Sequence, residues 1–186
     1  MISFVDTVQQ HLDVIKDLLP ERQKLDRAGL LLASALGSGN KILLCGNGGS
    51  AADCQHAAAE LMVRYRITGH PLAALALTTD TSILTAHSND FGYDTVFARQ
   101  VQGLGTAGDV LVAISTSGNS RNILEAVEAA RRKKISTIGL TGATGNNLAR
   151  AVDIGVVVPS TITARIQEAH MLILHWWCQL MEEKQR

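Results

Sequence analysis

Five short apolar runs alternate with helix-length segments along this chain of 186 residues. Within each run apolar and polar residues do not alternate, which is typical of strands buried on both faces of a sheet. Repetition of strand, helix and strand implies right-handed crossovers. The pattern predicts an α/β fold: a doubly wound, mostly parallel five-stranded sheet with helices on both faces. The runs cover residues 42–45, 72–77, 110–114, 137–140 and 154–158.

Amphipathic helical patterns precede the first apolar run. Apolar residues recur at helical spacing over residues 2–19 and 22–36, and Pro20 interrupts the pattern between them. Residues 1–37 are therefore expected to form a pair of helices ahead of the sheet region, which spans 41–158.

A long helix is expected at the end of the chain, over residues 161–184. Pro159 precedes it, and Ser160 or Thr161 can cap it. Its middle is apolar almost all round, which in a chain of this size favours contact with another subunit. Because no linker separates the parts, residues 1–186 are expected to form a single domain, and 46% hydrophobic residues suffice for its core.

Composition excludes several classes of protein. Lys plus Arg number 17 and Asp plus Glu number 17, so no basic surplus indicates nucleic acid or an anionic membrane as a partner. Cys45, Cys54 and Cys178 have neither the spacing of a metal site nor that of a disulfide framework. The first residues lack a leader pattern, and the apolar stretch 169–181 is too short to span a bilayer. We expect a cytoplasmic protein without nucleic-acid or membrane partners.

A glycine-rich loop, Gly46-Asn47-Gly48-Gly49-Ser50, follows the first apolar run. Glycines allow a tight turn and a close approach to a ligand, and free N–H groups at a helix start favour an anion. Ligands of open α/β sheets gather at the carboxyl ends of the strands, so a phosphate or a polar sugar would fit here. The alternative is a plain turn in which Ser50 is the N-cap of a helix that opens near Ala51.

A second loop, Ser115-Thr116-Ser117-Gly118-Asn119-Ser120, follows the third apolar run. Its four hydroxyls precede a helix expected over 121–132 and can donate several hydrogen bonds to one phosphate. The alternative is a hydroxyl-rich cap and turn. Neither loop matches the dinucleotide fingerprint or the nucleotide P-loop, so a phosphorylated small molecule is favoured over a nucleotide.

Histidines and one glutamate are the remaining candidates for chemistry. His56 and Glu60 are four residues apart and share one helix face, where they could bind zinc or act as acid and base. Gln167, His170 and His175 interrupt the apolar last helix and need polar partners. For His56 and Glu60 the structural alternative is an exposed pair on a helix surface. For a histidine of the last helix it is a core histidine bonded to a carbonyl.

Asn89-Asp90 lies between two apolar segments. A role in chemistry and a plain Asx turn are equally compatible with this pair.

Four motifs, taken together, resemble one family. They are Gly46 to Ser50, Asn89-Asp90-Phe91-Gly92, Ile114 to Ser120 and Arg165-Ile166-Gln167-Glu168. In this order and spacing they resemble the sugar isomerase (SIS) domain proteins, and the chain is similar to the phosphoheptose isomerase family over nearly its whole length. The resemblance implies an SIS domain, a homotetramer with active sites between subunits, and one zinc ion per subunit.

The resemblance also implies an enzyme, an aldose–ketose isomerase. Its reaction converts sedoheptulose 7-phosphate to D-glycero-D-manno-heptose 7-phosphate, the first step towards the ADP-heptose of lipopolysaccharide core. Moving a carbonyl from C2 to C1 through an enediol requires a group that removes a proton and one that returns it, and a carboxylate with a histidine can do both.

Residue roles follow from the same resemblance. Substrate binding falls to Asn47, Gly48, Gly49, Ser50, Asn89, Asp90, Ser115, Thr116, Ser117, Ser120 and Gln167, the hydroxyl-bearing residues holding the phosphate. Zinc ligation falls to His56, Glu60, Gln167 and His175. Glu60 and His175 are expected to be the catalytic base and its acid–base partner.

Other functions stay open at this point. A relative of the same fold binds the bacterial replication initiator and lacks the carboxylate and histidine that correspond to Glu60 and His175, so their presence favours an enzyme. An isomerase of another sugar phosphate is an alternative, because such loops do not specify chain length. Ala164 stands where many of these isomerases carry Asp. A DNA-binding regulator is disfavoured, since no helix-turn-helix segment is left over.

Overall fold

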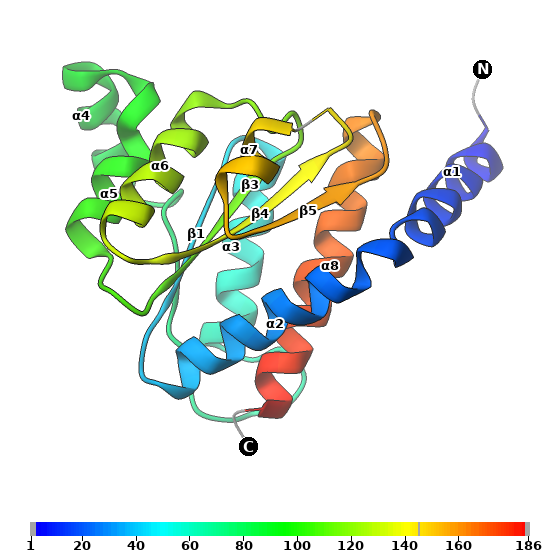
Figure 1. The fold of residues 1–186 in the computed structure, drawn as a ribbon, viewed down its shortest axis with the longest axis horizontal. Coiled ribbons are helices and arrows are strands. Elements are labelled where there is room, and N and C mark those ends of the chain that lie inside the picture. Colours follow the sequence, from blue (N-terminus) through cyan, green and yellow to red (C-terminus); the bar gives the residue numbers. More distant parts are fainter. Residues whose placement is uncertain (1–2, 145, 185–186) are drawn as a thin grey trace.

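The computed structural model describes residues 3–144 and 146–184. Five parallel strands form one sheet in the order β2-β1-β3-β4-β5, which confirms the doubly wound α/β prediction (Figure 1). The strands are β1 (Ile42–Gly46), β2 (Ala74–Ala76), β3 (Val110–Ser115), β4 (Ser136–Gly142) and β5 (Ile154–Val158). The order reverses between β1 and β3, so the crevice at their carboxyl ends is where such a sheet binds ligands.

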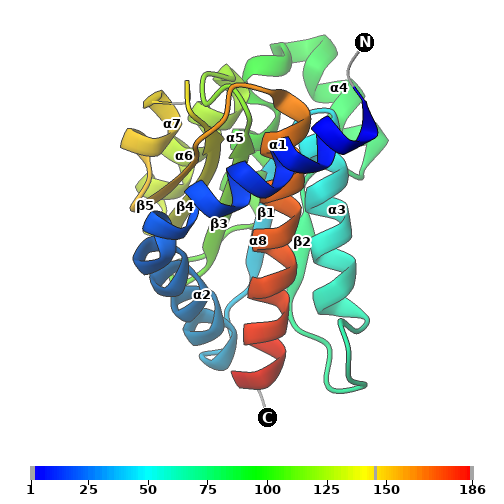
Figure 2. The ribbon, with the colours of Figure 1, turned by 90° about the vertical axis from the view of Figure 1, so that its right-hand side faces the viewer.

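Helices cover both faces of the sheet (Figures 1 and 2). One face carries α2 (Arg22–Gly37), α3 (Gly49–Met62) and α8 (Thr163–Lys184), and the other carries α5 (Val96–Leu104), α6 (Arg121–Arg132) and α7 (Asn146–Ala151). Alternate residues of β1 enter the two cores: Leu44 packs on the α8 side and Leu43 on the α6 side. Burial on both faces explains why the strands have apolar runs without alternation.

Three further helical segments lie outside these layers: η1 (Leu19–Glu21), α4 (Thr81–Phe91) and η2 (Tyr93–Thr95). The first helix, α1 (Phe4–Asp17), begins with a Ser3–Asp6 capping box and projects from the body of the fold (Figure 1). It has no buried residue, and polar contacts such as His11 Nδ1 to Glu168 Oε2, 2.8 Å, join it to α8.

Three local predictions differ from the structure. The helix after the glycine-rich loop begins at Gly49, with Gly48 as N-cap at φ 56°, so the predicted start at Ala51 with Ser50 as cap is wrong. Only a residue that tolerates positive φ suits this cap. Asn89 and Asp90 lie in the last turn of α4 rather than in an Asx turn, because α4 runs on to Phe91.

The last helix also differs in detail. It begins at Thr163, later than the predicted 161, because residues 161 and 162 form the turn in which Ser160 Oγ accepts a hydrogen bond from the Ile162 N–H. Only one side of α8 is buried within the chain, and Leu172 and Trp176 on another side are exposed. Among the described residues, no helix combines the length and apolar character needed to cross a membrane.

Candidate active site

The two predicted ligand loops lie side by side at the carboxyl edge of the sheet. β1 and β3 are hydrogen-bonded neighbours, with Gly46 paired to Ile114, so the loops that follow them start from adjacent positions. A side-chain pair joins them across this gap: Asn47 and Asn122, at the start of α6, exchange two hydrogen bonds of 2.9 Å. The structure thus brings the predicted phosphate and sugar loops together at one edge of the sheet.

The hydroxyl-rich loop forms a compact cluster of hydroxyl groups. Ser115 Oγ lies 3.1 Å from Ser120 Oγ and 3.4 Å from Ser117 Oγ, and it accepts a hydrogen bond from the Gly118 N–H. Gly118 turns the loop at φ 64°. Ser120 is the N-cap of α6 but makes no side-chain capping bond, which leaves the first N–H groups of the helix available to an anion.

The glycine-rich loop receives a side chain from the last helix. The Gln167 amide rests on Gly49 so closely that a Cβ there would lie 2.3 Å from Nε2. Ser50 is buried at the start of α3, while Gly48 and Gly49 are exposed at the turn. A glycine at position 49 therefore lets Gln167 reach the loop.

A second cluster lies farther along α3, at about two to three turns from Gly48. His56 Nε2 and His175 Nε2 are 2.8 Å apart and share a hydrogen bond between α3 and α8. Glu60 Oε1 lies 3.7 Å from His56 Nε2, and the Tyr65 ring packs at 5.8 Å from the His175 ring. A cavity of about 360 Å³ adjoins Glu60 and Tyr65. The structure therefore joins the predicted base and its histidine partner into one group.

The donor chemistry of this cluster suits zinc, since two imidazole nitrogens and a carboxylate oxygen are ligands that zinc accepts. Their arrangement is that of a hydrogen-bonded pair with a carboxylate beside it. Over residues 3–144 and 146–184, no three His, Cys, Asp or Glu side chains stand together as a metal site. Gln167, the fourth predicted ligand, lies against Gly49 at the other cluster.

Asn89 and Asp90 lie on the exposed last turn of α4, where Asn89 Nδ2 donates to Asp90 Oδ1 at 2.9 Å. No hydrogen bond joins either side chain to the two loops among the described residues. Tyr93, a short way along the chain, does reach the site: its hydroxyl donates to Asn47 Oδ1 at 3.1 Å.

Sequence reasoning did not single out Asp53, a buried acid next to the cluster. Burial raises the pKa of its carboxyl to about 6, and nearby His56 opposes the shift. Oδ2 has no hydrogen-bond partner within the described chain. A signal was present, because Asp53 falls at a buried position of α3 beside Cys54 and Ala57, where an acid is unexpected.

His170 is buried like a core histidine, but its ring lacks the expected hydrogen bond. It is fully buried, and burial lowers its pKa to about 4 while the backbone of Thr141 opposes the fall. Neither ring nitrogen has a hydrogen-bond partner of good geometry among the described residues, which departs from the carbonyl-bonded histidine considered as an alternative. His170 is therefore held neutral beneath the site.

Comparisons with known proteins agree with this geometry. Residues 3–142 match the model of the SIS domain family. The chain is 52% identical over 159 residues to the phosphoheptose isomerase of Campylobacter concisus, covering 86% of this chain and 84% of that protein. It is 50% identical over 175 residues to that of Aliarcobacter butzleri, covering 94% and 93%. This chain belongs to the phosphoheptose isomerase family.

The same family accounts for the three-dimensional similarity. The solved phosphoheptose isomerase of Neisseria gonorrhoeae superimposes with a TM-score of 0.90 at 45% identity, over 96% of each chain. This match confirms the SIS-domain resemblance seen in the four motifs. The SIS domain match ends at residue 142, whereas the superposition covers 96% of this chain. It therefore extends to α8 of this chain, which carries Gln167 and His175.

Proposed function

We propose that this protein isomerises sedoheptulose 7-phosphate to D-glycero-D-manno-heptose 7-phosphate through an enediol. One observation carries the proposal: in a chain about half identical to phosphoheptose isomerases, Glu60 and His175 converge through their contacts with His56. A phosphorylated heptose would place its phosphate at the hydroxyl-rich loop and its carbonyl end toward the cluster.

The phosphate end of the substrate is assigned to the hydroxyl-rich loop. Ser115, Thr116, Ser117 and Ser120 supply hydroxyl donors without a full positive charge. The uncapped start of α6 adds backbone N–H groups and the positive end of the helix dipole. Ser50 assists from the neighbouring loop.

The sugar chain is assigned to Asn47, Gly48, Gly49 and Gln167, with Asn89 and Asp90 approaching from the end of α4. The close contact of Gln167 with Gly49 supports this placement of the amide. Since no hydrogen bond joins the Asn89 or Asp90 side chain to the loops within the described chain, we propose that their part requires the assembled oligomer.

Proton transfer is assigned to Glu60 and His175. Glu60 removes the proton from C1 of the ketose and forms the enediol, and it returns a proton at C2 when the aldose is made. His175 exchanges the hydroxyl protons at the two oxygens, a task that suits an imidazole near neutral pH. The 2.8 Å bond to His56 orients the His175 ring for this work.

A zinc ion, one per subunit, is part of the proposal. His56, Glu60, Gln167 and His175 would hold it, and the facing Nε2 atoms of His56 and His175 support the two imidazole ligands of this set. Bound zinc would polarise the substrate carbonyl and stabilise negative charge on its oxygen.

A homotetramer with active sites between subunits completes the proposal. Its support is apolar surface that one chain leaves uncovered. Phe4, Val5 and Leu12 on α1 and Leu172 and Trp176 on α8 are exposed large hydrophobic side chains. Such surfaces are typical of subunit interfaces. The product would enter the cytoplasmic route to ADP-heptose and lipopolysaccharide core.

The test is an assay of the purified protein with sedoheptulose 7-phosphate, before chelation, after chelation and after zinc is added back. Turnover restored by zinc is the expected result. Turnover that is unchanged by chelation would support the isomerase activity and contradict a role of zinc in it. A folded protein without turnover on this substrate would redirect the assignment to another sugar phosphate or to initiator binding, which further sugar phosphates in the same assay would distinguish.

A further inference from the structure

The Asn47 carboxamide is held by two residues from outside its own loop. Asn122, in the first turn of α6, donates from Nδ2 to Asn47 Oδ1 and accepts from Asn47 Nδ2, both at 2.9 Å. Tyr93, on η2, donates its hydroxyl to the same Oδ1 at 3.1 Å. The two lone pairs of Oδ1 are therefore occupied, and among the described residues one N–H of Asn47 is left without a partner.

We infer that Asn122 and Tyr93 are positioning residues, which orient Asn47 so that it offers the sugar a single N–H donor and keeps its oxygen turned away. This inference rests on the proposed function, in which Asn47 contacts the sugar. It deepens that function by naming the chemistry of the contact. Asn47 recognises a ligand oxygen, as in a sugar hydroxyl or carbonyl, and does not accept a proton from it.

Asn122 is suited to this role by its burial. Asn122 is 4% exposed, so its side of the amide pair is shielded from competing water. An amide pair of this kind is reciprocal: each partner needs one donor and one acceptor from the other. Asn122 also stands directly after the hydroxyl-rich loop, so the pair sets the sugar-contacting loop at a defined distance from the phosphate-binding helix start.

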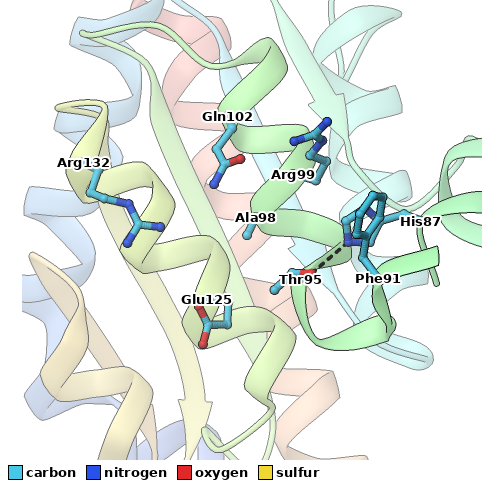
Figure 3. A pocket seen from close by; sticks show the side chains of 8 residues that line it. All are labelled: His87, Phe91, Thr95, Ala98, Arg99, Gln102, Glu125 and Arg132. Carbon is cyan, nitrogen blue, oxygen red and sulfur yellow. Dashed lines mark hydrogen bonds between the residues drawn. The ribbon is translucent and has the colours of Figure 1, made fainter. Parts of the chain in front are cut away.

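Tyr93 is suited because the segment that carries it is itself anchored. Figure 3 shows the hydrogen bond between His87 Nε2 and Thr95 Oγ1, 2.9 Å, which ties the end of η2 to α4. The Tyr93 ring packs edge-on at 6.3 Å from the ring of buried Phe97. The hydroxyl is thus presented to Asn47 from a fixed backbone.

The test compares Asn122→Asp, Asn122→Ala and Tyr93→Phe with the wild type on sedoheptulose 7-phosphate. An ionised Asp offers two acceptors and no donor, so one contact to Asn47 becomes repulsive. We expect the KM of N122D to rise roughly tenfold and that of Y93F roughly threefold, with kcat nearly unchanged, because the contact acts on ground state and transition state alike.

The pH profile separates positioning from a general structural role. Position 122 is buried, and burial raises the pKa of a carboxyl. A protonated Asp regains the missing donor, so the KM ratio of N122D to wild type should fall as the pH is lowered from 8 to 5. N122A has no titratable group and should keep its raised KM throughout. Asn40→Asp, a matched change at the opposite end of the sheet, should leave KM unchanged. Melting temperatures show that each variant is folded.

The outcomes distinguish the inference from the function beneath it. Wild-type protein without turnover overturns the proposed function and the inference with it. Active wild type with an unchanged KM in both N122D and Y93F overturns the inference alone. So does a loss of kcat at constant KM, which indicates a smaller fraction of active enzyme. Tyr93 is a half-exposed ring, so Y93F should fold. If N122D fails to fold, the KM of Y93F alone tests the inference.

Discussion

The hydroxyl-rich loop and the His56–Glu60–His175 cluster are built in different ways. The loop is one continuous segment after β3, and its hydroxyls contact one another within a few residues: Ser115 Oγ lies 3.1 Å from Ser120 Oγ. The cluster needs two helices, because His56 and His175 are 119 positions apart and meet only where α3 packs on α8. A candidate binding loop can thus be recognised locally, whereas the proposed catalytic pair depends on the tertiary fold.

The largest expected effect is on the cluster. Glu60→Gln removes the proposed base while keeping the shape of the side chain, so kcat should fall by about 10²- to 10⁴-fold with little change in KM. The measurement is turnover of sedoheptulose 7-phosphate. Glu128→Gln, the same change on an exposed part of α6, should leave kcat unchanged. Comparable turnover in E60Q and wild type would remove Glu60 from the base role.

The next effect concerns the stability contribution of His170, which lies on α8 between Gln167 and His175. Its folded pKa of about 4 lies below the usual value of 6.5, so the unfolded chain binds its proton first as the pH falls. Stability from this group is present above pH 6.5 and is lost towards pH 4, by up to about 3 kcal/mol. Urea unfolding at several pH values should show a shallower acid loss for His170→Gln. Equal slopes in mutant and wild type would contradict this.

Substitutions in the hydroxyl-rich loop should change KM more than kcat. Ser117→Ala combined with Ser120→Ala removes two donors to the phosphate, so KM should rise roughly 10- to 100-fold, with a smaller effect on kcat. Ser34→Ala with Ser38→Ala, two exposed positions at the end of α2, is the matched control. An unchanged KM in the loop variant would place the phosphate elsewhere.

The smallest effect tests the contact between the glycine-rich loop and Gln167, which lies on the same helix as His175. A Cβ at position 49 would lie 2.3 Å from Gln167 Nε2, so Gly49→Ala must displace the end of that flexible side chain. We expect KM to rise a few-fold with almost no loss of stability. Gly103→Ala on α5, where a Cβ meets nothing within 4 Å, is the control. If G49A binds substrate as the wild type does, Gln167 does not contact the sugar.

The difference between the two regions also explains what the sequence predicts. The five strands follow from apolar runs because burial on both faces leaves that signature, and the helix limits 121–132 match α6. The hydroxyl-rich loop is likewise local. Local patterns failed at Gly48, where a positive φ starts α3 earlier than periodicity indicates.

Long-range contacts account for the rest. Tyr93 and Asn122 reach Asn47 from 46 and 75 positions away, and no period of two or 3.6 residues encodes such contacts. Asn122 did leave a trace, as a polar residue at a buried helical position beside Ile123 and Ala126. The zinc ligand set remains a prediction, because the structure brings Gln167 to Gly49 and the histidines to each other.

The most direct measurement follows solvent deuterium during turnover. Sedoheptulose 7-phosphate is incubated with the protein in D₂O, and the product is examined by NMR for deuterium on the carbon beside the carbonyl. Proton transfer through an enediol at Glu60 predicts that deuterium enters the product with wild-type protein and that E60Q loses this exchange. Equal deuterium incorporation by E60Q and the wild type would contradict the account.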